Sequence, residues 1–152
     1  RGMSSAASDV YKRQGLGCRS VSKIYLPKDY DLDILFKQVY SWKDIINNSS
    51  YYNNYTYNKT IYLMSEEKFF DNGFLILKES TEIGSPIGAV FFEYYENDNT
   101  VIKSLKKYSE KIQCIVGKNI VENSVEFGNT QRPSLDDFAD KINTLDFLLK
   151  VS

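Results

Sequence analysis

The stretch GFLILKESTEIGSPIGAVFFEYYEN, residues 73–97, places two apolar runs on either side of a loop. The runs, residues 73–80 and 89–97, are rich in aliphatic and aromatic side chains, a composition typical of strands. The turn signal DNG at residues 71–73 precedes the first run, and the glycines and proline of residues 81–88 predict the loop. This stretch therefore predicts two strands of one sheet.

The region upstream predicts a strand and a helix. Residues 21–26 have strand composition and stop at Pro27, and Asp29 or Asp31 can cap the helix that follows. Apolar side chains at three- and four-residue steps extend that helix to about residue 46: Leu32, Leu35, Val39, Trp42 and Ile46. Residues 47–50, NNSS, break it. The next segment is ambiguous, and its candidate helix face is formed by Tyr51, Tyr55, Ile61 and Met64.

The region downstream predicts a further helix, a buried strand and a final helix. A helix beginning within residues 97–99 would carry Val101, Ile102, Leu105 and Tyr108. IQCIVG, residues 112–117, is a continuous apolar run that predicts a strand buried on both faces. Residues 125–133 predict a shorter strand and a loop, and a last helix starts at Ser134. The order of elements predicts an α/β fold with a mixed or largely parallel sheet flanked by helices.

Composition excludes several classes of function. The 152-residue chain has a net charge of -1, which argues against nucleic acid as its main partner, and no apolar run approaches the length of a membrane span. It contains no histidine, so a Cys–His or Ser–His pair cannot form within it. Its two cysteines cannot assemble a zinc site by themselves, so no metal site is expected.

The first fourteen residues differ in character from the rest. RGMSSAASDVYKRQ, residues 1–14, has no apolar periodicity and resembles translated sequencing-adapter read-through. We therefore expect residues 1–14 to be a non-native or disordered tail and the genuine sequence to occupy residues 15–152, continuing from a longer chain.

Cys18 is the candidate for covalent chemistry. It lies beside Gly15 and Gly17, which permit a tight turn with little bulk around the sulfur, and Arg19 can lower the thiol pKa if its side chain folds back. From the residues alone, Cys18 is a buried core thiol, half of a disulfide or a nucleophile presented on a turn. Cys114 lies in an apolar run and is interpreted as a core residue.

Three segments resemble one family of enzymes. GLGCRSVSKIYLPKDYDLD, residues 15–33, resembles the nucleophile segment of the aldehyde dehydrogenase superfamily. EIGSPI, residues 82–87, resembles its Glu-x-Phe-Gly-Pro-Val loop, with Gly84 where the family often has Phe and Ser85 in place of Gly. FGNTQRPSLDDFADKINTLDFL, residues 127–148, resembles the end of the acyl-CoA reductases related to the bioluminescence fatty-acyl reductase.

The resemblance implies a function for the chain. It implies that residues 15–152 are a C-terminal catalytic-domain fragment of an NADPH- or NADH-dependent, cytoplasmic acyl-CoA reductase, with the cofactor domain upstream. Cys18 would take the acyl group from acyl-CoA or an acyl-protein thioester, Glu82 would bind the nicotinamide ribose, and a fatty aldehyde would be released. The full-length protein would be a homo-oligomer, and the fragment alone would be inactive.

Two other interpretations remain open. The first is an aldehyde-oxidising NAD(P)-dependent dehydrogenase of the same superfamily. The second, of another class, is a non-catalytic α/β interaction domain in which Cys18 is incidental.

Overall fold

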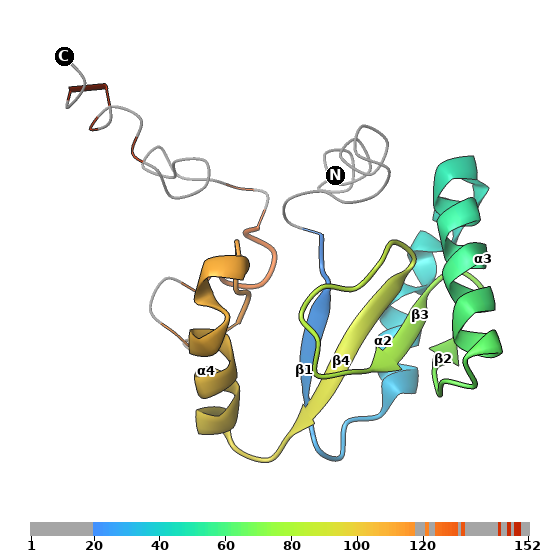
Figure 1. The fold of residues 1–152 in the computed structure, drawn as a ribbon, viewed down its shortest axis with the longest axis horizontal. Coiled ribbons are helices and arrows are strands. Elements are labelled where there is room, and N and C mark those ends of the chain that lie inside the picture. Colours follow the sequence, from blue (N-terminus) through green and yellow to red (C-terminus); the bar gives the residue numbers. More distant parts are fainter. Residues whose placement is uncertain are drawn as a thin grey trace. The chain divides into compact units, whose positions relative to one another are not determined.

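A four-stranded mixed sheet is the centre of the fold (Figure 1). The computed structural model describes residues 20–117, 121, 124–130, 132, 143, 146, 148 and 149. The chain divides into two compact units, Arg1–Val101 and Ile102–Ser152, and the sheet belongs to the first.

The strand order of the sheet is β1-β4-β3-β2. The strands are β1 (Lys23–Pro27), β2 (Phe70–Asp71), β3 (Ile76–Glu79) and β4 (Ala89–Tyr95). β4 pairs in parallel with both β1 and β3, whereas β2 is antiparallel to β3. The prediction of an α/β fold with a mixed sheet is therefore confirmed.

Each face of the sheet is covered by a helix. Ala89 and Phe91 of β4 pack in a cluster with tyrosines of α3 (Ser49–Met64). Phe92, on the opposite face, packs in a second cluster with apolar residues of α2 (Leu32–Val39). Because both faces of β4 are covered, its sequence is nearly continuous in apolar residues, as in buried parallel strands.

The strands predicted at residues 21–26, 73–80 and 89–97 are confirmed as β1, β3 and β4, with shifted bounds. β3 begins only at Ile76, because Asn72 Oδ1 accepts hydrogen bonds from the backbone N–H groups of Phe74 and Leu75 and holds them in a turn. Pro27 is the last residue of β1, which lies at an edge of the described sheet, where a residue without an N–H costs no ladder hydrogen bond.

Only the first half of the helix predicted for residues 31–46 is α-helical. α2 is capped by Asp31, whose Oδ1 accepts a hydrogen bond of 2.9 Å from the Asp33 N–H. The chain then continues as the 3₁₀ helix η1 (Tyr40–Asn47). Ile45 and Ile46 of η1 pack against the cluster on the α3 side, whereas α2 packs on the other side of the sheet. The change of helix type therefore accompanies a crossing from one face to the other.

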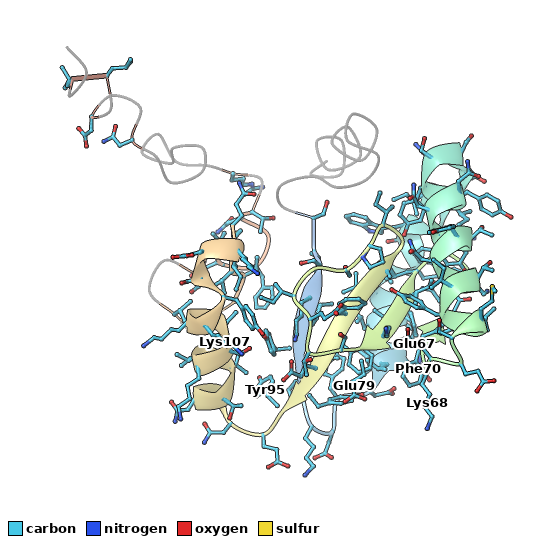
Figure 2. The ribbon with its side chains drawn as sticks, in the orientation of Figure 1. Glu67, Lys68, Phe70, Glu79, Tyr95 and Lys107 are labelled. Atoms are coloured by element: carbon cyan, nitrogen blue, oxygen red, sulfur yellow. The ribbon has the colours of Figure 1, made fainter. Side chains whose placement is uncertain are left out.

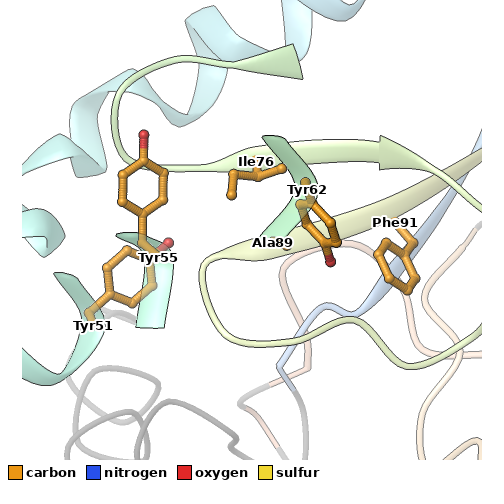
Figure 3. Close-up of a cluster of buried hydrophobic side chains, with 6 residues drawn as sticks. All are labelled: Tyr51, Tyr55, Tyr62, Ile76, Ala89 and Phe91. Atoms are coloured by element: carbon orange, nitrogen blue, oxygen red, sulfur yellow. The ribbon is translucent and has the colours of Figure 1, made fainter. Parts of the chain in front are cut away.

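The ambiguous segment is the helix α3, and its buried face differs from the predicted one. Asn48 Oδ1 caps it by accepting a hydrogen bond from the Tyr51 N–H. The residues that face the sheet are Tyr51, Tyr55, Asn58 and Tyr62. Ile61 and Met64 are exposed, Met64 by 80%, so their prediction as face residues was wrong. The tyrosines recur at helical spacing and their rings supply the apolar contact surface (Figure 3).

A polar cluster joins α3 to the turn after β2. Asp71 Oδ1 accepts a hydrogen bond of 2.7 Å from Tyr55 Oη, and Asp71 Oδ2 lies 2.5 Å from Lys59 Nζ. Burial alone would raise the pKa of Asp71, but the hydrogen bonds from Lys59 and Tyr55, with one from the Gly73 N–H, outweigh it and lower the pKa below its usual value. The folded state therefore stabilises the ionised carboxylate.

The lowered pKa of Asp71 predicts a pH-dependent effect of Lys59→Met. Asp71 contributes stability above the unfolded pKa, and this contribution is lost as the pH falls through the lower folded pKa. Because Lys59 is partly exposed, we expect the variant to lose about 0.5–1 kcal/mol of unfolding free energy at pH 7. Urea unfolding should show this loss shrinking below the usual aspartate pKa. A loss that grows in acid, or that equals that of the exposed control Lys103→Met, would contradict it.

The second unit contains less regular structure than predicted. The helix predicted from residues 97–99 is confirmed as α4 (Asp98–Lys107), which spans the boundary of the units. The strand predicted for residues 112–117 is wrong: among the described residues it forms a single parallel bridge, Val116↔Val125, and only Gly117 of the six is buried. In the described part of the chain, this one bridge partner does not supply the neighbours that would cover both faces of a strand. Cys114 is a half-buried free thiol rather than a core residue.

Two further predictions fall outside the described residues: the tail of residues 1–14 and nearly all of the helix from Ser134. In the part of the chain that the structure describes, no helix is long and apolar enough to cross a membrane.

Candidate functional site

The loop that carries Glu82 joins two parallel strands without a helix. β3 ends at Glu79 and β4 begins at Ala89, so residues 80–88 must return the chain to the opposite end of the sheet. Parallel connections normally need a dozen or more residues and a helix. The short loop suffices here because β3 has four residues, so the return path is short.

The first part of this loop fixes Glu82 by its backbone. The Ser80 N–H donates to the carbonyl oxygen of Phe92 at 3.0 Å, and the Glu82 N–H donates to Ser80 Oγ at 3.1 Å. Glu82 itself is exposed, and its carboxylate makes no hydrogen bond or ion pair with any described residue. A carboxylate presented in this way can accept hydrogen bonds from two adjacent hydroxyl groups of a ligand.

The second part of the loop is held against α3. Asn58 Nδ2 donates to the carbonyl oxygen of Ile87 at 2.9 Å and to that of Asn54 at 2.9 Å. Gly88 approaches the backbone of Tyr55 so closely that a Cβ at this position would lie 2.8 Å from Tyr55 Cα. The loop is therefore attached to the sheet at its start and to α3 at its end.

A charged and aromatic cluster is formed between β3 and the C-terminal part of α3. Lys78 of β3 forms an ion pair with Glu67, which follows α3 (Figure 2), and its Nζ lies 4.6 Å from the ring centroid of Tyr62 and 5.6 Å from that of Phe91. Burial raises the pKa of Tyr62, and the negative charges of Glu67 and Glu82 raise it further.

Sequence reasoning missed this cluster. Lys78 interrupts the apolar run FLILK, which was the available signal for a lysine that packs on aromatic rings rather than in solvent. The predicted helix face included Ile61 and Met64 but not Tyr62, which is the residue that is buried. Among the described residues, no group of three histidine, cysteine or acidic side chains could hold a metal ion.

Cys18 lies outside the described residues. Because the segments of Cys18 and Glu82 both resemble parts of one cofactor site, we expect the two side chains to face one cleft, and this stays a prediction. The strand that follows Cys18 is described. The Phe91 N–H donates to the carbonyl oxygen of Ser22 at 3.0 Å, so the chain enters β1 at the end of the sheet where β4 begins. The loop of Glu82 returns to this same end before it enters β4.

The sequence matches no family model, and comparisons with curated proteins and with solved structures return no match either.

Proposed function

We propose that this chain is the catalytic-domain part of an NADPH- or NADH-dependent acyl-CoA reductase of the aldehyde dehydrogenase type. The observation that carries the proposal is the loop of Glu82. The sequence of this loop, EIGSPI, resembles the ribose-binding loop of that superfamily. The backbone N–H of Glu82 is anchored by Ser80, and the Glu82 carboxylate is exposed and unpaired among the described residues. These properties support the proposal because a group that binds ribose hydroxyls must be accessible and free to accept hydrogen bonds.

In the proposed reaction, the Cys18 thiolate attacks the carbonyl carbon of the acyl thioester. A new carbon–sulfur bond forms, and the bond to the CoA sulfur breaks as CoA leaves with the electron pair. NADPH or NADH, when bound, supplies the hydride that reduces the acyl carbon. The Cys18 sulfur then leaves as the hemithioacetal collapses, which releases the aldehyde and restores the thiolate. Glu82 would hold the ribose hydroxyls and thereby orient the reacting groups.

The role of Glu82 is tested by Glu82→Gln in the longer parent protein that this function requires. We expect KM for the reduced cofactor to rise by about tenfold or more, because hydrogen bonds to a charged group contribute about 1.5–3 kcal/mol. Acylation of Cys18 in the absence of cofactor should change little. Steady-state kinetics with varied cofactor and a single-turnover acylation assay measure the two effects.

Glu79→Gln is the matched control for this variant. Glu79 is an exposed glutamate at the end of β3 (Figure 2). Its substitution makes the same change of charge three residues away from Glu82. It should leave the cofactor KM unchanged. Equal effects of the two variants, or an unchanged KM in Glu82→Gln, would contradict the assignment of Glu82.

A further inference from the structure

The turn between β2 and β3 brings together the Asp71 carboxylate, the Asn72 side-chain amide and the Gly73 backbone nitrogen. Asn72 precedes Gly73, and no other asparagine in the chain is followed by glycine. Asp71 Oδ1 accepts a hydrogen bond of 2.9 Å from the Gly73 N–H. Asn72 Oδ1 accepts hydrogen bonds from the N–H groups of Phe74 at 3.2 Å and Leu75 at 2.9 Å.

The amide nitrogen of Asn72 is the unusual member of this turn. Nδ2 is buried and has no hydrogen-bond partner among the described residues. Buried polar groups are nearly always paired, so this one calls for an explanation. Two backbone N–H groups hold the side-chain oxygen of Asn72, whereas no described residue holds the nitrogen on the same carbon.

This arrangement matches the needs of an internal attack on the Asn72 amide. The nucleophile is the backbone nitrogen of Gly73, which has no side chain to obstruct a close approach. The Asp71 carboxylate is placed to accept its proton. The two N–H groups on Asn72 Oδ1 are placed to stabilise the negative charge that develops on that oxygen during the attack.

We propose that Asn72 is a self-modification site at which the folded chain converts the asparagine to an aspartyl residue through a cyclic imide. A bond forms between Gly73 N and Asn72 Cγ while the Gly73 proton passes to Asp71. The bond from Cγ to Nδ2 then breaks, and ammonia leaves after taking up that proton. Water opens the imide at either carbonyl and gives an ordinary or a β-linked aspartate. No oxidant, reductant or cofactor is required.

The two products differ in their effect on the fold. An ordinary aspartate at position 72 keeps an oxygen for the Phe74 and Leu75 N–H groups. A β-linked aspartate inserts an extra methylene into the main chain and shifts Phe74, which is buried and whose carbonyl oxygen accepts a hydrogen bond of 2.9 Å from Tyr51 Oη. Formation of the β-linked product would therefore loosen the attachment of α3 to the sheet.

The test compares the same chain in its folded and unfolded states. Wild-type protein is incubated at neutral pH with and without urea, and conversion at Asn72 is followed by peptide mapping with mass spectrometry. We expect faster conversion in the folded chain, with the asparagines that precede serine, Asn48 and Asn123, as slower internal references. Slower conversion of Asn72 in the folded chain than in urea would overturn the proposal, since the turn would then protect the amide.

Asp71→Asn tests the proton acceptor. The variant keeps an oxygen near the Gly73 N–H but removes the basic carboxylate, so we expect conversion to slow by about tenfold. This is less than a general base usually contributes, because the ion pair with Lys59 makes the Asp71 carboxylate a weaker base. Circular dichroism establishes whether the variant is folded. A folded variant that converts as fast as wild type would overturn the role of Asp71. If the variant does not fold, the comparison of folded and unfolded wild type decides by itself.

Discussion

Replacement of Cys18 by serine in the parent protein is expected to abolish rapid acylation by a labelled long-chain acyl-CoA. Without reduced cofactor, the wild-type parent should retain label as a thioester that neutral hydroxylamine cleaves, and added NADPH should discharge it as aldehyde. A serine hydroxyl is far less ionised than a thiol near neutral pH, and no histidine exists within this chain to activate it. We expect the labelling rate to fall on the order of 10³-fold or more, as for other lost nucleophiles.

Cys114→Ser is the matched control, because Cys114 is the other cysteine of the chain and is a half-buried free thiol. It should label like the wild type. Normal labelling of Cys18→Ser together with loss of label in Cys114→Ser would overturn the assignment of the nucleophile. Label on neither variant nor wild type, in a parent that binds NADPH, would favour a different substrate class or the non-catalytic interaction domain. Oxidation of aldehydes to acids by a parent that does not take label from acyl-CoA would favour the aldehyde-oxidising dehydrogenase.

The parts of the fold that the sequence predicted are those in which local pattern and tertiary environment agree. β4 is apolar on both faces and is covered on both. Of the two aspartates predicted as possible caps, Asp29 and Asp31, it is Asp31 that caps α2. The pattern failed where the covering surface comes from elsewhere in the chain. In residues 112–117 an apolar run predicted a buried strand, but such a run requires neighbours on both sides, and the described residues supply only Val125.

The candidate site shows the same division. Glu82 could be selected from its sequence segment, and the structure places it in an exposed loop. The anchoring of that loop could not be predicted, because it depends on contacts with α3. Asparagine is a poor helix former, yet Asn58 lies within α3 and its amide donates to the carbonyl oxygen of Ile87 in the loop. Likewise, Lys78 Nζ lies over the Tyr62 ring only because the fold brings α3 and β3 together.

Gly88→Ala is expected to produce the largest loss of stability of any single-methyl addition at the loop of Glu82. The new Cβ would lie 2.8 Å from Tyr55 Cα, 2.9 Å from Tyr55 Cβ and 3.2 Å from Tyr55 N, and none of these atoms belongs to the flexible end of a side chain. The φ angle of Gly88 is +81°, in the region that side chains disfavour. Overpacking costs about 1–3 kcal/mol and the left-handed backbone about 1–2 kcal/mol, so we expect a loss of about 2–5 kcal/mol.

Two other glycines separate the causes of this loss. Gly73 has a φ of +92° but no atom within 4 Å of its would-be Cβ, so Gly73→Ala should show only the backbone cost of about 1–2 kcal/mol. Gly84, in the same loop as Gly88, has neither a positive φ nor a close neighbour, so Gly84→Ala should change stability by less than about 0.5 kcal/mol. Urea unfolding of the three variants, followed by circular dichroism, gives the order directly. A loss in Gly88→Ala no greater than that in Gly73→Ala would mean that α3 yields to the extra methyl group, and that the loop of Glu82 is not held against Tyr55 as the structure places it.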